Sequence, residues 1–128
     1  MTKIKICGLT DPKEAVYLNK HQVDYAGFVL FFPKSKRNLT IEQAKEIMRA
    51  LDTTIQKVAV VVSPTLEQVL EIERANFDII QIHGTLQDDV LEAVSIPIFK
   101  AFNITDMAHF PTYQKCEKIK GCTLELQN

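Results

Sequence analysis

A cysteine at the end of the first apolar stretch is the first side chain to consider for chemistry. Ile4 and Ile6 alternate with lysines, as residues of a strand do, and the run ends at Cys7-Gly8, where a loop should begin. In folds built of repeated strand-helix units, the carboxyl ends of the strands gather around the ligand. The thiol of Cys7 is therefore expected at the end of the fold where a ligand would bind.

A polar loop from Phe32 to Asn38 offers a second group. It carries Lys34, Lys36 and Arg37 within four positions. Three cations so close together suit a phosphate or an acidic ligand, although charges in a loop most often only keep a surface soluble. The pattern leaves both interpretations open.

A third group follows the apolar run that begins at Asp78. Gln81 and His83 lie two positions apart, so on a strand they share one face, and Gly84 follows them. His83 either lines a site at the strand end or simply bonds to the backbone there. The two interpretations have about equal weight.

The bulk composition indicates one soluble domain over residues 1–128. The chain is 46% hydrophobic with a net charge of −1, so no broad basic surface favours nucleic acid. Its apolar runs are shorter than the ~20 residues that span a bilayer, and no signal peptide is evident, which predicts a cytoplasmic protein. Cys116 and Cys122 match no metal-binding spacing, so we expect reduced thiols, no metal and no cofactor.

The chain alternates predicted strands and helices five times. Capping boxes begin helices at Thr40 and Thr65, and Thr85 starts a similar pattern. The helix predicted from Thr105 to about Lys118 is weaker because Pro111 interrupts it. The expected strands cover residues 3–7, 24–31, 57–63, 78–84 and 96–102, and a sixth segment begins at residue 121.

Such alternation predicts an α/β fold of repeated βα units with parallel strands. Two architectures satisfy it. The first is part of a (β/α)₈ TIM barrel, with about five units and a stub of the sixth. The alternative is a flattened, open flavodoxin-like sheet, which the length alone would favour.

Four motifs together resemble the phosphoribosylanthranilate isomerase family of tryptophan biosynthesis. They are Lys5-Ile6-Cys7-Gly8-Leu9-Thr10, Gly27-Phe28-Val29 with Pro33-Lys34-Ser35-Lys36-Arg37, Val58-Ala59-Val60-Val61-Val62, and Gln81-Ile82-His83-Gly84. The resemblance extends from Lys3 to about Gly121. It implies the partial TIM barrel rather than the open sheet.

The resemblance also implies roles for individual residues. The family carries out an Amadori rearrangement of N-(5-phosphoribosyl)anthranilate, in which an acid protonates the ribose ring oxygen and a base removes the C2 proton. Cys7 matches the base, and Arg37 matches the residue that binds the anthranilate carboxylate, for which a planar guanidinium is suited. His83 matches a residue lining the same mouth, with Gln81 beside it.

Two parts of the family pattern do not occur in these residues. The general acid is an aspartate after the sixth strand, yet no aspartate follows Asp106, and no glycine-rich phosphate loop is present. We therefore expect a truncated form without useful isomerase activity on its own. The competing prediction is a non-catalytic module that self-associates or binds a small anion.

Five strands taken from an eight-stranded barrel would leave two unpaired edges and an apolar interior. Unpaired edges invite another chain. We therefore expect a homo-oligomer formed through the exposed sheet edges.

Overall fold

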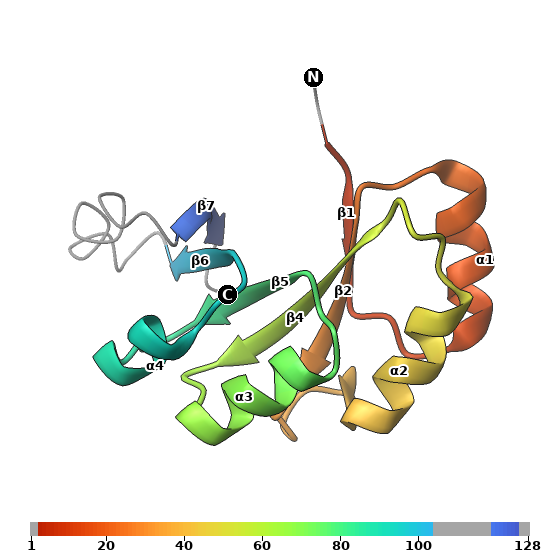
Figure 1. Cartoon of the computed structure of the whole chain (residues 1–128). Coiled ribbons are helices and arrows are strands. Elements are labelled where there is room, and N and C mark those ends of the chain that lie inside the picture. The colour runs from red at the N-terminus through yellow and green to blue at the C-terminus, as the bar shows by residue number, and fades with distance from the viewer. Residues whose placement is uncertain (1–2, 104–118, 126–128) are drawn as a thin grey trace.

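The structure is a computed structural model, which describes residues 3–103 and 119–125. One seven-stranded parallel sheet runs through it in the order β1-β2-β4-β5-β6-β7, with β3 paired to β2 (Figure 1). The strands are β1 (Lys5–Cys7), β2 (Tyr25–Leu30), β3 (Asn38–Leu39), β4 (Gln56–Val62), β5 (Ile79–His83), β6 (Ile98–Asn103) and β7 (Ile119–Glu125).

The strand order decides between the two predicted architectures. Apart from the short β3, each strand pairs with its successor in the chain, as in a TIM barrel, whereas a flavodoxin-like sheet places its first strand between the second and third. The flavodoxin-like alternative is therefore wrong. The sheet that the described strands form is open, because β1 and β7 lie at opposite ends of its strand order.

Local sequence signals account for most helix boundaries. The helices are α1 (Pro12–His21), α2 (Ile41–Ala50), α3 (Leu66–Arg74) and α4 (Asp88–Ala93). Asp11, Thr40 and Thr65 each form a complete capping box. In it, the side chain of the N-cap residue accepts a backbone N–H bond from the first turn, and the side chain of the third helical residue accepts the backbone N–H of the N-cap residue. These caps begin the first three helices, and those at Thr40 and Thr65 lie where the sequence predicts.

The predicted helix start at Thr85 is wrong. Its backbone N–H donates to Ser63 Oγ at 2.9 Å, so this residue belongs to a loop-loop contact instead. The helix begins at Asp88, and its N-cap, Gln87, makes no capping hydrogen bond with its side chain. The contact between Thr85 and Ser63 therefore takes the place of the helix cap that the local sequence predicts. The weaker helix predicted from Thr105 to about Lys118 lies outside the described residues.

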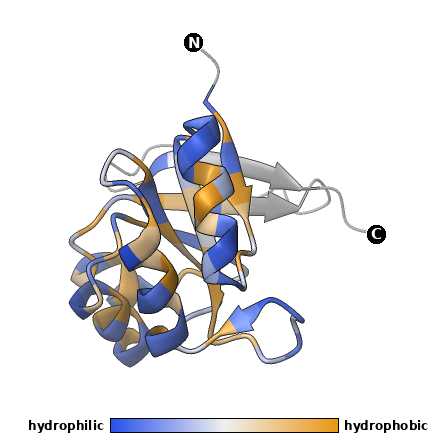
Figure 2. Ribbon diagram, turned by 90° about the vertical axis from the view of Figure 1, so that its right-hand side faces the viewer, coloured by the Kyte–Doolittle hydropathy of each residue, from blue (hydrophilic) through white to orange (hydrophobic). Residues whose placement is uncertain are grey.

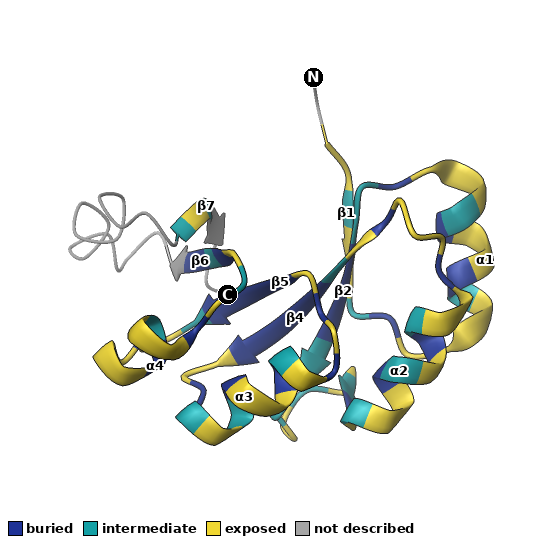
Figure 3. Ribbon diagram, in the orientation of Figure 1, coloured by how far each residue is buried: buried dark blue, intermediate teal, exposed yellow. Residues whose placement is uncertain are grey.

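The two faces of the sheet differ in how they are covered. Helices α1, α2 and α3 pack on one face, where their buried residues join a large apolar cluster with alternate strand residues such as Phe28, Val61 and Ile80 (Figures 1 and 3). Hydrophilic residues follow the outward sides of the helices (Figure 2). The opposite face has a smaller cluster of Val58, Val60 and Ile79.

The sheet curls around this second face, which we call the inner face. The Tyr25 ring on β2 meets the Phe99 ring on β6, with centroids 5.6 Å apart. Lys5 on β1 donates to Gln81 on β5. Neither pair lies on neighbouring strands, so the sheet must bend as a barrel wall does.

None of the described helices is long and apolar enough to cross a membrane.

Candidate functional site

Cys7 is the last residue of β1 and lies beside the middle of β2 in the sheet. Its register partner is Gly27, and a Cβ built there would lie 2.9 Å from the Cys7 sulfur. Gly27 therefore makes room for the thiol. Gly8 turns the chain with a φ of +84°, which favours glycine, and its N–H donates to the Gly27 carbonyl at 3.0 Å. The cysteine is free and exposed at the inner face.

Arg37 reaches the same point from the loop after β2. A Cβ on Gly8 would lie 3.0 Å from Arg37 Nη1 and 3.2 Å from Nε, so the guanidinium covers the turn that follows Cys7. Asn38 fixes the loop, since its side chain accepts the Phe32 N–H at 2.7 Å and its backbone begins β3. Arg37 therefore lies against the residue that follows Cys7 in the chain.

His83 ends β5 beside the loop after β4. Its carbonyl accepts the Ser63 N–H at 2.8 Å, while its ring Nε2 lies 2.9 Å from Gln81 Nε2. Gln81 is 2% exposed, so its amide belongs to the interior of the fold. Both residues lie on the inner face, as their spacing predicts.

Lys5 links the two sides of the site, which sequence reasoning missed. It precedes Cys7 by two positions and so shares its face, and its ammonium donates to Gln81 Oε1. Ile4 and Ile6 are instead 51% and 41% exposed, opposite to the usual pattern of a strand with its apolar residues inside. The Lys-x-Cys spacing was the available signal.

Cys7 and His83 end their strands, and Arg37 lies in the loop after β2, so all three belong to the carboxyl-terminal side of the sheet. Because all the strands are parallel, β1, β2 and β5 end at one rim, where Figure 1 shows their connecting loops. This rim carries a thiol, a guanidinium and an imidazole, and the amide of Gln81 lies beside the imidazole. Among the residues that the structure describes, no cluster of three or more His, Cys, Asp or Glu residues could hold a metal ion.

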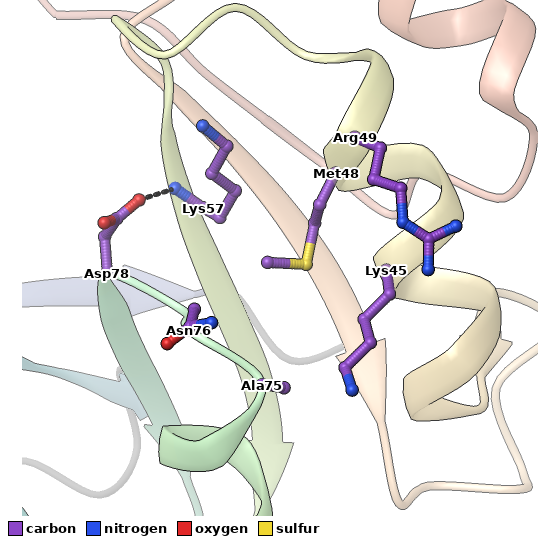
Figure 4. A pocket seen from close by; sticks show the side chains of 7 residues that line it. All are labelled: Lys45, Met48, Arg49, Lys57, Ala75, Asn76 and Asp78. Carbon is purple, nitrogen blue, oxygen red and sulfur yellow. Dashed lines mark hydrogen bonds between the residues drawn. The ribbon is translucent and has the colours of Figure 1, made fainter.

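A separate hollow of about 330 Å³ lies toward the other end of the sheet. Residues from α2, from the start of β4 and from the α3–β5 connection line it, among them Lys45, Arg49, Lys57 and Asp78. Figure 4 shows its cationic groups pointing in different directions, and Lys57 Nζ donates to the Asp52 carbonyl at 3.2 Å. Cations that diverge do not surround one anion, so this hollow is not part of the candidate site.

Comparison with known proteins identifies relatives of this chain. The family model described as N-(5'phosphoribosyl)anthranilate (PRA) isomerase matches residues 4–125, slightly beyond the expected limit at Gly121. The N-(5'-phosphoribosyl)anthranilate isomerase of Streptococcus mutans is 38% identical over 105 residues, which are 81% of this chain and 53% of that protein.

Solved structures of similar sequence share the fold. The phosphoribosyl anthranilate isomerase of Thermotoga maritima aligns with 100% of this chain and 63% of its own, with a TM-score of 0.86 and 27% identity. A phosphoribosyl anthranilate isomerase solved with reduced 1-(o-carboxyphenylamino)-1-deoxyribulose 5-phosphate gives a TM-score of 0.85 at 27% identity, over 100% of this chain and 66% of that one.

The chain spans about half the length of the curated relatives it matches. The match nevertheless includes every strand that carries the candidate site, from Cys7 to His83. The chain therefore belongs to the N-(5'-phosphoribosyl)anthranilate isomerase family.

Proposed function

We propose that this rim is the amino-terminal half of an isomerase active site in tryptophan biosynthesis. The substrate is N-(5'-phosphoribosyl)anthranilate, and the reaction is its Amadori rearrangement to the open-chain ketose. The observation that carries the proposal is the guanidinium of Arg37 lying over Gly8, directly after Cys7. A carboxylate bound by Arg37 would place the rest of a substrate beside the thiol.

Cys7 and Arg37 would supply two of the functions that this reaction needs, proton removal and carboxylate binding. Protonation of the ribose ring oxygen breaks its bond to C1, and the electron pair on the anthranilate nitrogen forms the imine. The sulfur of Cys7 then takes the C2 proton, which gives the enol that tautomerises to the ketone. Arg37 binds the anthranilate carboxylate through its planar fork. The ligand named for one related structure supports this pairing, since it contains a carboxyphenyl group and a 5-phosphate.

These 128 residues would supply only part of the catalytic machinery. The protonation step needs an acid, and the 5-phosphate needs backbone donors, yet after Asp106 the sequence has neither an aspartate nor a glycine-rich loop. We expect a chain limited to these residues to have negligible turnover, because positioning and electrostatic stabilisation both lack half their groups.

A hybrid chain tests the assignment. Residues 1–125 would be followed by the remaining units of the Thermotoga maritima relative, and isomerisation would be followed with fresh substrate. We expect turnover from the hybrid and none above background from the 128 residues alone. Turnover by the 128 residues at the rate of an ordinary enzyme would contradict the half-site, and a correctly folded hybrid without activity would contradict the isomerase.

We also propose that the open sheet self-associates. Within residues 3–103 and 119–125, no strand pairs with the outer side of β1 or of β7. The apolar side chains of Tyr25, Val29 and Phe99 are only partly buried on the inner face. A second copy would cover this surface. A single domain over residues 1–128 and a cytoplasmic location complete the proposal.

A further inference from the structure

The buried amide of Gln81 lies between two other polar side chains, one on each side. Lys5 Nζ donates to its Oε1, and its Nε2 lies 2.9 Å from Nε2 of His83. Lys5 comes from β1, while Gln81 and His83 belong to β5, so this chain of contacts crosses the inner face. At 2% exposure, the amide depends on these partners rather than on water.

The order of donors and acceptors along this chain is fixed at one end. A lysine ammonium has donors and no acceptor, so the Gln81 atom that faces Lys5 must be the carbonyl oxygen. The amide NH₂ therefore faces the histidine. Because NH₂ can only donate, Nε2 of His83 must be the acceptor and carries no proton.

We propose that Lys5 and Gln81 are positioning residues that hold His83 as the neutral tautomer protonated on Nδ1. Rotation of the amide would place its NH₂ against the ammonium and leave two donors facing each other. The contact on β1 thus determines which nitrogen on β5 carries the proton, across the two strands that lie between them.

This tautomer has a consequence for the reaction, which rests on the function proposed above. The Nε2 lone pair is occupied by Gln81, so His83 cannot remove the C2 proton through that nitrogen. Through Nδ1 the ring is a hydrogen-bond donor and not a base. Proton removal then falls to Cys7, the other candidate base at this rim.

Nitrogen NMR of the 128-residue chain tests the proposal without turnover. The ¹⁵N shifts of histidine rings distinguish protonated from unprotonated nitrogens, and a His83→Asn variant identifies the signals among the three histidines. At mildly alkaline pH we expect Nδ1 of His83 to be protonated and Nε2 unprotonated. A ring protonated mainly on Nε2 would overturn the proposal.

Variants of the two positioning residues test the cause. Lys5→Met frees the amide to rotate, and we expect the tautomer ratio to shift about tenfold toward Nε2–H, since bonds from charged donors are among the stronger ones. Lys5→Arg retains a donor and should restore the original ratio. Gln81→Glu should move the proton to Nε2, because a carboxylate only accepts.

Lys13→Met is the matched control, since Lys13 is an exposed lysine on α1, and it should leave the ratio unchanged. Circular dichroism checks that each variant folds. If folded Lys5→Met has the same shifts as the original chain, the positioning role is wrong. An inactive hybrid with the predicted tautomer would instead contradict the isomerase assignment alone, so the two failures are distinguishable.

Discussion

The two faces of the sheet hold matching aromatic pairs in unlike surroundings. On the helix-covered face, Phe28 meets Phe77 edge to face with centroids 5.9 Å apart, and the exposures are 0% and 3%. On the inner face, Tyr25 meets Phe99 at 5.6 Å, yet both residues are only partly buried. The same kind of aromatic contact is therefore fully buried on the helix-covered face and partly exposed on the inner face.

This difference assigns the two faces different tasks. The helix-covered face buries the larger cluster and so supplies most of the apolar stabilisation. The inner face has only a small apolar cluster, and it also carries the polar side chains of Lys5, Gln81 and His83. Stability and chemistry are thus separated by the alternation of side chains along each strand.

The largest expected effect is on the free energy of unfolding. Phe28→Ala should reduce it by about 3–5 kcal/mol, because a fully buried ring leaves a cavity that its neighbours cannot fill. Phe99→Ala should cost at most about half of that, since its ring already meets solvent. Urea unfolding followed by circular dichroism measures both.

If Phe28→Ala and Phe99→Ala reduced the free energy of unfolding equally, the two faces would not differ in burial as described. That outcome would mean that the inner face is covered in solution, by a second copy or by another segment. Repeating the measurement over a range of protein concentrations separates these cases, because only association makes stability depend on concentration.

The second effect concerns self-association. We expect light scattering to give a mass above that of the 14.6 kDa monomer, because a partial barrel leaves apolar surface exposed. Val62→Asp should shift the chain toward the monomer, since Val62 is 37% exposed and follows Val58 and Val60 on the inner face.

Tyr17→Asp is the matched control, because Tyr17 is 67% exposed on α1, on the other face of the sheet. It should leave the mass unchanged. A monomer produced by Tyr17→Asp but not by Val62→Asp would place the contact on α1 and contradict association through the inner face. A folded chain that is monomeric without either change would contradict self-association itself.

Much of the fold was predictable because its signals are local. The caps at Thr40 and Thr65 begin their helices as expected, and the β-branched run from Val58 to Val62 lies in a buried strand. Thr85 failed because Ser63, 22 positions away, accepts its N–H. The short β3 was missed because only its pairing with the end of β2 makes it a strand.

The site was predictable in part for a related reason. Cys7 and His83 stand at strand ends, which a sequence reveals, and Arg37 was found through the family resemblance. Lys5 was missed because its partner, Gln81, is 76 positions away and meets it only when the sheet curls. Contacts of that kind depend on the curvature of the whole sheet.

The rate of the hybrid chain with Cys7→Ala tests the central claim most directly. General base catalysis is worth about 10²–10⁴-fold, so we predict a loss of kcat within that range, with circular dichroism unchanged. Lys36→Met, an exposed cation beside Arg37 in the sequence, should leave kcat unaltered. A folded Cys7→Ala hybrid that retains the original kcat would contradict the assignment of the base, and with it the account of this rim.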